Sequence, residues 1–63
     1  MYFLNYDYGV HPVKINVEKE SFFKVIDDLS NEFTIFKLHD VDVEYYQIEN
    51  YYGDLVIIGG VYK

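Results

Sequence analysis

The densest group of side chains that could do chemistry lies between residues 40 and 46. On a strand, side chains alternate between two faces, so Asp40, Asp42 and Glu44 would share one face, and Tyr46 would end the same row. Two residues of strand rise separate neighbouring carboxylates by about 6.6–6.8 Å. This spacing resembles that of phosphates along a nucleic-acid strand, and it predicts a face that docks in a basic groove. The alternative is the solvated face of an edge-protected strand.

The same carboxylates are poor candidates for a metal site. Oxygen ligands suit Ca²⁺ or Mg²⁺, but carboxylates about 7 Å apart on a straight strand cannot converge on one ion. His39 would point to the opposite face from Asp40. The chain has no cysteine, which excludes thiolate zinc sites and disulfides. We therefore expect no metal ion and no cofactor.

Catalytic groups are equally sparse. The only serines, Ser21 and Ser30, have no Gly-x-Ser-x-Gly context. The paired carboxylates Asp27 and Asp28 are adjacent on a predicted helix and so face different directions. A domain of 63 residues also has little volume for a substrate cleft. We expect that the protein is not an enzyme.

Tyrosine is the second notable signal, with eight in the chain. The adjacent pairs Tyr45-Tyr46 and Tyr51-Tyr52 must each expose at least one ring if the chain is extended there. Tyrosine is enriched at protein interfaces, and here it is interleaved with acids rather than bases. This favours a basic protein surface as the ligand. The alternative is that tyrosine merely fills the surface of a small, lysine-poor domain.

The formal net charge of −6 is unevenly distributed. Residues 1–26 contain three acids and three lysines, so they sum to zero. Residues 27–54 contain eight acids and only Lys37, which gives −7, and Lys63 restores one positive charge. Such a field repels nucleic acid and anionic membranes and attracts basic surfaces. We expect no direct contact with nucleic acid or membrane.

Periodicity in the first half of the chain predicts a hairpin followed by a helix. Residues 2–8 and 13–17 alternate apolar and polar side chains, as strands do, and residues 9–12 contain turn-forming glycine and proline. From Glu18 the period changes to that of an amphipathic helix of about three turns. Its apolar stripe consists of Phe22, Val25, Ile26 and Leu29.

The second half predicts three further strands, at residues 33–38, 41–50 and 55–61, with a turn at 50–54. Residues 55–58 are apolar on both faces, which indicates a central strand. The fold class is therefore α+β: a small, mostly antiparallel sheet in β-β-α-β-β-β order, with one helix packed on one face. The helix stripe is expected to pack on Val41, Val43, Ile57 and neighbouring sheet residues.

Length and composition indicate one soluble, cytoplasmic domain over residues 1–63. No stretch approaches the ~20 apolar residues of a membrane span, and the N-terminus carries Asp7 and no basic region, unlike a signal peptide. So short a chain buries only about 60% of its unfolded surface. It therefore needs a rich core or a partner subunit.

No residue pattern identifies a family. In size, acidity, aromatic content and lack of cysteine, the chain resembles the small antagonists that phages use against host nucleic-acid enzymes. These include anti-restriction, glycosylase-inhibitor and anti-CRISPR proteins, some of which mimic nucleic acid. The resemblance implies action in the host cytoplasm.

We predict an inhibitor or regulator that docks on a basic protein, of the kind that binds nucleic acid. The alternative is a structural module that forms a homodimer through a sheet edge or a tyrosine patch. The predicted docking face comprises Asp40, Asp42, Glu44, Tyr46, Glu49, Tyr51, Tyr52 and Asp54, with Asp27, Asp28 and Glu32 adding to the negative field.

Overall fold

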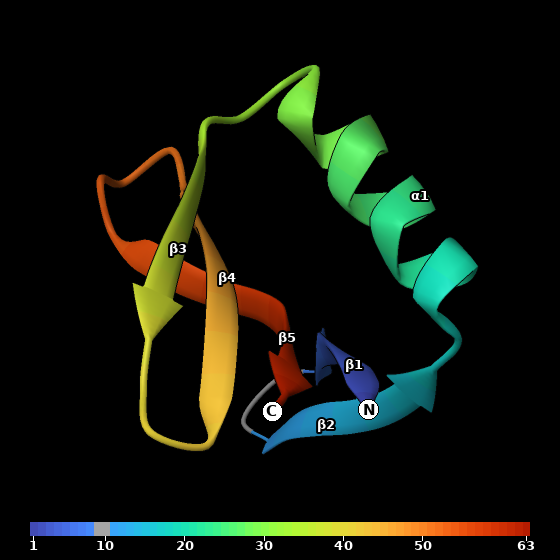
Figure 1. Ribbon diagram of the computed structural model, residues 1–63. Coiled ribbons are helices and arrows are strands. Elements are labelled where there is room, and N and C mark those ends of the chain that lie inside the picture. Colours follow the sequence, from blue (N-terminus) through green and yellow to red (C-terminus); the bar gives the residue numbers. More distant parts are fainter. Residues whose placement is uncertain (9–10) are drawn as a thin grey trace.

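The computed structural model describes the backbone of residues 1–8 and 11–63 and the side chains of residues 1–6 and 13–63. It consists of a five-stranded antiparallel sheet and one helix (Figure 1). The elements are β1 (Tyr2–Tyr8), β2 (His11–Val17), α1 (Lys19–Ser30), β3 (Ile35–His39), β4 (Val43–Glu49) and β5 (Leu55–Tyr62). The predicted α+β class and element order are confirmed.

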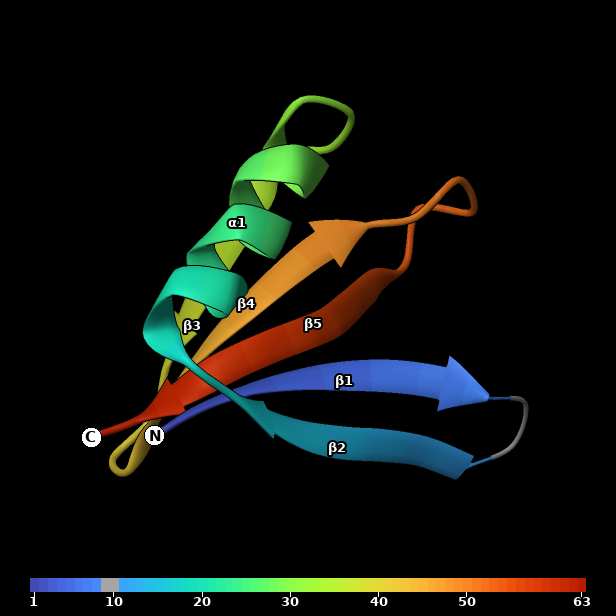
Figure 2. The same cartoon turned by 90° about the vertical axis from the view of Figure 1, so that its right-hand side faces the viewer.

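The strands lie in the order β2-β1-β5-β4-β3, so β5 is central, as its apolar sequence predicted. β1 and β2 form the predicted hairpin, with Tyr2 opposite Val17. The predicted turn at 9–12 falls partly on residues 9–10, outside the described residues, and β2 already begins at His11. Because β1 pairs with β5, the two ends of the chain lie side by side (Figure 2), and the Tyr62 N–H donates to the Met1 carbonyl at 2.8 Å.

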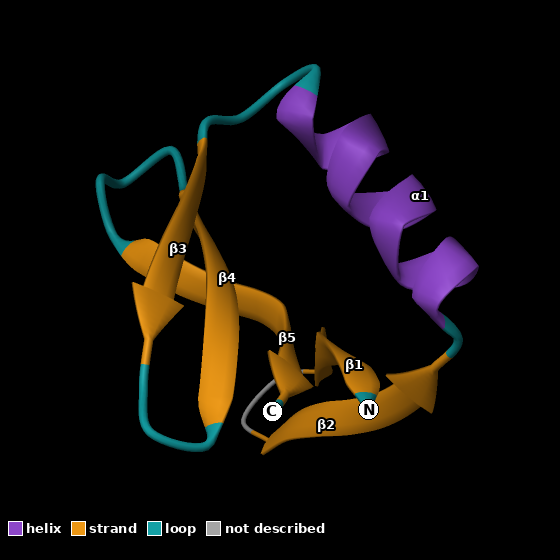
Figure 3. Cartoon of the chain, viewed as in Figure 1, coloured by secondary structure: helices purple, strands orange, loops and turns teal. Residues whose placement is uncertain are grey.

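The helix lies as a separate layer over one face of the sheet (Figure 3). Phe22 and Ile26 from its predicted stripe are buried against Leu4 and Tyr46. The Phe22 ring makes an edge contact with the Tyr46 ring, with centroids 5.1 Å apart. This aromatic cluster is the main core of the protein.

The predicted sheet partners of the helix were wrong. Val41 lies in the turn between β3 and β4 and is 86% exposed. Val43 is buried, but it lies outside the core cluster under the helix, because β4 turns Tyr46 toward the helix and odd-numbered residues away. Ile58 packs on that core in place of Ile57, since a register shift beside Tyr46 changes the alternation of β5.

A smaller cluster lies on the sheet face away from the helix. Phe3 is fully buried there, with its ring over Gly60, where a side chain would clash with it. The Phe3 ring is 6.4 Å from Tyr45 and 5.2 Å from Tyr62, measured between ring centroids. Lys14 Nζ lies 4.5 Å from the Phe3 ring centroid and donates to the Tyr62 hydroxyl at 2.7 Å. Lys14 thereby ties β2 to β5 across β1.

The helix can approach the sheet at Gly59 only because this residue has no side chain. A Cβ at Gly59 would lie 2.5 Å from the Phe3 carbonyl oxygen and 3.0 Å from the Phe22 ring. Gly59→Ala should therefore lower the free energy of unfolding by about 1–3 kcal/mol or more. Urea unfolding measures this, with Val41→Ala as an exposed control that should change it by at most about 0.5 kcal/mol. Equal stability of the two variants would contradict the packing.

Candidate protein-docking surface

The predicted straight row of carboxylates does not form. β4 begins only at Val43, so Asp40 and Asp42 lie in the turn that precedes it. The Asp40 carboxylate accepts the Val41 N–H at 2.7 Å, and the Asp40 N–H donates to the Val43 carbonyl at 2.9 Å. Aspartate is favoured in such turns because its side chain forms hydrogen bonds with nearby backbone groups. The expectation of a strand through this segment was therefore wrong.

Glu44 does lie on β4, but its carboxylate faces groups of the neighbouring strand. Its oxygens are 3.8 Å from Lys37 Nζ and 3.6 Å from His39 Nδ1. Lys37 and His39 are more exposed than Glu44, whose side chain is 21% exposed. A partly exposed pair of this kind contributes about 0–1 kcal/mol. Glu44 is thus partnered within the sheet rather than presented to a ligand.

Tyr46 is a core residue. Its side chain is 6% exposed and packs against Phe22, and Lys37 Nζ lies 5.3 Å from its ring centroid. The sequence placed Glu44 and Tyr46 correctly on one face of β4. That face is the one the helix covers, so Tyr46 is not part of a docking face.

The turn between β4 and β5 carries the two most exposed tyrosines among the side chains that the structure describes. Tyr51 and Tyr52 are 90% and 91% exposed. The Asn50 side-chain oxygen accepts the backbone N–H groups of Tyr52 at 2.9 Å and Asp54 at 3.0 Å. Gly53 closes the turn at φ 83°, which glycine adopts without strain. The turn is therefore held in one conformation by its own hydrogen bonds.

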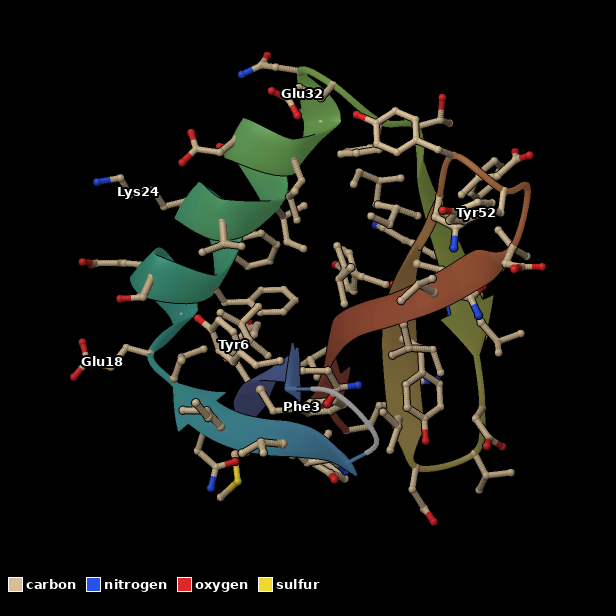
Figure 4. All side chains as sticks on the ribbon, turned by 180° about the vertical axis from the view of Figure 1, so that it is seen from behind. Phe3, Tyr6, Glu18, Lys24, Glu32 and Tyr52 are labelled. Atoms are coloured by element: carbon tan, nitrogen blue, oxygen red, sulfur yellow. The ribbon has the colours of Figure 1, made fainter. Side chains whose placement is uncertain are left out.

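Acidic side chains surround this turn. Exposed Glu49 and Asp54 flank it directly. The Phe33 ring, which follows α1, lies 5.8 Å from the Tyr51 ring between centroids, and it brings the end of the helix to the turn. Figure 4 shows Glu32 and Tyr52 toward the same end of the molecule. We use the name acidic end for the exposed acids and tyrosines of this turn and of the C-terminal end of α1 with the residues that follow it: Asp27, Asp28, Glu32, Glu49, Tyr51, Tyr52 and Asp54.

Local electrostatics make the acidic end attractive to cations. Asp27 and Asp28 lie in the last turns of α1, where the helix dipole is already negative, and no basic residue occupies the last turn.

The β3–β4 turn with Asp40 and Asp42 lies at the other end of β4 (Figure 3). The structure therefore separates the exposed predicted docking residues into two groups, while Glu44 is partnered within the sheet and Tyr46 lies in the core. Only one group combines carboxylates with exposed tyrosines.

Other kinds of site find no support in the described part of the chain. No three histidine, aspartate or glutamate side chains among these residues are placed to hold a metal ion. Ser30 donates its hydroxyl hydrogen bond to the Asp27 carbonyl, which is a helix-end contact. No helix formed by the described residues is long and apolar enough to cross a membrane. No protein-family model, curated protein or solved structure matches the chain at a significant level.

Proposed function

We propose that the protein is a small inhibitor or regulator that docks its acidic end on a basic surface of another protein. The observation that carries the proposal is the pair Tyr51 and Tyr52, almost fully exposed on a hydrogen-bonded turn between carboxylates. Tyrosine offers rigid apolar area with a polar tip, and it forms strong contacts once a partner covers it.

Charge and tyrosine contribute differently to such binding. The carboxylates steer a basic partner toward this end and raise the rate of association. The tyrosine rings then supply the desolvated contact that slows dissociation. Because Asn50 already fixes the turn, little ordering entropy is lost when the partner binds.

The partner we propose is a nucleic-acid-binding protein, because such proteins carry extended basic surfaces. The mimicry of a phosphate row by Asp40, Asp42 and Glu44 is not part of the proposal, since these residues do not form a row. The carboxylates of the acidic end form a patch instead. Antagonists of the anti-restriction, glycosylase-inhibitor or anti-CRISPR kind, acting in the cytoplasm, have targets of this class.

A capture experiment with charge-matched baits tests the proposal. The test bait carries Glu32→Gln, Glu49→Gln and Asp54→Asn. The control bait carries Glu18→Gln, Glu20→Gln and Asp42→Asn, which remove the same charge away from the acidic end. Both baits should stay folded, because all six carboxylates are exposed.

Wild-type and control baits should capture the same basic protein from a lysate, and the test bait should lose it. In a purified pair, the test variant should bind at least about tenfold more weakly, equivalent to about 1.4 kcal/mol. Equal binding by the test and control baits would overturn the proposal.

A further inference from the structure

The two edge strands of the sheet differ in how well they are protected from pairing with another strand. β2 contains Pro12, which has no backbone N–H donor and so hinders the pairing of another strand with that edge. β3 contains no proline, and its basic side chains lean inward onto β4. Lys37 Nζ lies 3.8 Å from a Glu44 oxygen, and His39 Nδ1 lies 3.6 Å from the other. The basic side chains that could discourage another strand from pairing with β3 therefore contact Glu44 within the sheet.

The hydrogen-bonding pattern shows which backbone groups β3 leaves open. The Asp40 N–H donates to the Val43 carbonyl, which makes these two residues a hydrogen-bonded pair. Antiparallel pairs alternate, so Phe36 and Leu38 bond to β4 through their pairs with Gln47 and Tyr45. By the same alternation, the N–H and C=O groups of the odd-numbered residues 35–39 point away from the sheet. No backbone hydrogen bond within the described residues reaches these groups.

Apolar side chains are uncovered at the same edge. Phe36 and Leu38 are 40% and 48% exposed, on the sheet face away from the helix. An edge strand that combines free backbone groups with exposed apolar side chains is a template for strand addition.

We propose that a second copy of this chain binds here, through antiparallel pairing of β3 with β3 about a two-fold axis at Lys37. The symmetry places Phe36 of each copy opposite Leu38 of the other, so this apolar pair is formed twice. The outward backbone groups of the two strands then form up to about six hydrogen bonds. The result is a continuous ten-stranded sheet.

The charges at the β3 edge itself do not oppose a second copy, although each copy carries −6 overall. In the symmetric pair, the two Lys37 side chains are opposite each other, but each lies beside its own Glu44, so the central charges cancel. The described residues also bury only six hydrophobic side chains and leave twelve large ones exposed. Dimerisation is a common reinforcement for so small a core.

Cysteine cross-linking tests the edge and its register, because the chain has no cysteine of its own. Lys37→Cys places two thiols on a hydrogen-bonded pair with Cα atoms about 5.5 Å apart, within the range for a disulfide. A mild oxidant should convert this variant to a covalent dimer. Ile35→Cys and His39→Cys should cross-link when mixed and much less when alone. Ile15→Cys on the β2 edge is the control and should cross-link slowly.

Sedimentation equilibrium tests the dimer in the unmodified protein. The mass should rise from 7.6 kDa toward twice that value as the protein concentration increases. Added salt should strengthen the dimer, because each copy carries −6, whereas it should weaken binding of a basic partner. Leu38→Lys should restore the monomer mass, and the equally folded Ile15→Lys should leave the dimer intact. A wild-type mass of 7.6 kDa at every concentration, or equal cross-linking of Lys37→Cys and Ile15→Cys, overturns the proposal.

Discussion

Tyr46→Ala is expected to unfold most of the protein at room temperature. The variant removes a side chain that is 6% exposed and that contacts Phe22 at the centre of the core. Truncating a buried aromatic residue to alanine costs about 3–5 kcal/mol. A single core of this size supplies roughly 3–5 kcal/mol of net stability, so little remains. Circular dichroism and urea unfolding measure the loss.

Tyr52→Ala is the matched control, because it removes the same side chain from a site that is 91% exposed. Its free energy of unfolding should stay within about 0.5 kcal/mol of the wild type. If Tyr46→Ala melted like Tyr52→Ala, Tyr46 would not be a core residue, and the packing of α1 on β4 would be wrong.

Tyr52→Ala should stay folded, but it is expected to bind the captured partner much more weakly than the wild type. A tyrosine that a partner covers completely contributes about 2 kcal/mol or more to the free energy of binding. Loss of this contribution corresponds to a dissociation rate that is roughly 30-fold faster. Tyr52 is a sharper choice than Tyr51, because Tyr51 also contacts Phe33. Surface plasmon resonance measures the rate, and Tyr52→Phe should retain most of the affinity. Unchanged dissociation of Tyr52→Ala would exclude this turn from the interface.

The regular elements were predictable from the sequence because their periods are clear. Phe22, Val25 and Ile26 recur at helical spacing, and the packed face of α1 follows that stripe. The wholly apolar start of β5 indicated a central strand. The helix partners were not predictable, because they depend on where β4 begins and on a register shift beside Tyr46. Both are set by strand pairing rather than by local pattern.

The candidate site was predictable only in part. Adjacent tyrosines before Gly53 indicated an exposed turn, and Tyr51 and Tyr52 lie on it. Alternating residues from Asp40 onward predicted a strand, but the hairpin requires a turn there, and aspartate suits it. The approach of the helix end to the tyrosine turn depends on Phe33, whose tertiary contact no local pattern reveals.

The association rate with the captured partner, measured at low and high salt, tests the central claim most directly. If the acidic end steers a basic surface, the wild-type rate should fall steeply as salt rises. The variant with Glu32→Gln, Glu49→Gln and Asp54→Asn should associate about tenfold more slowly at low salt and show a shallow slope, since steering contributes at least this factor. The control with Glu18→Gln, Glu20→Gln and Asp42→Asn should keep most of the wild-type slope. Parallel slopes for the wild type and the acidic-end variant would contradict the account.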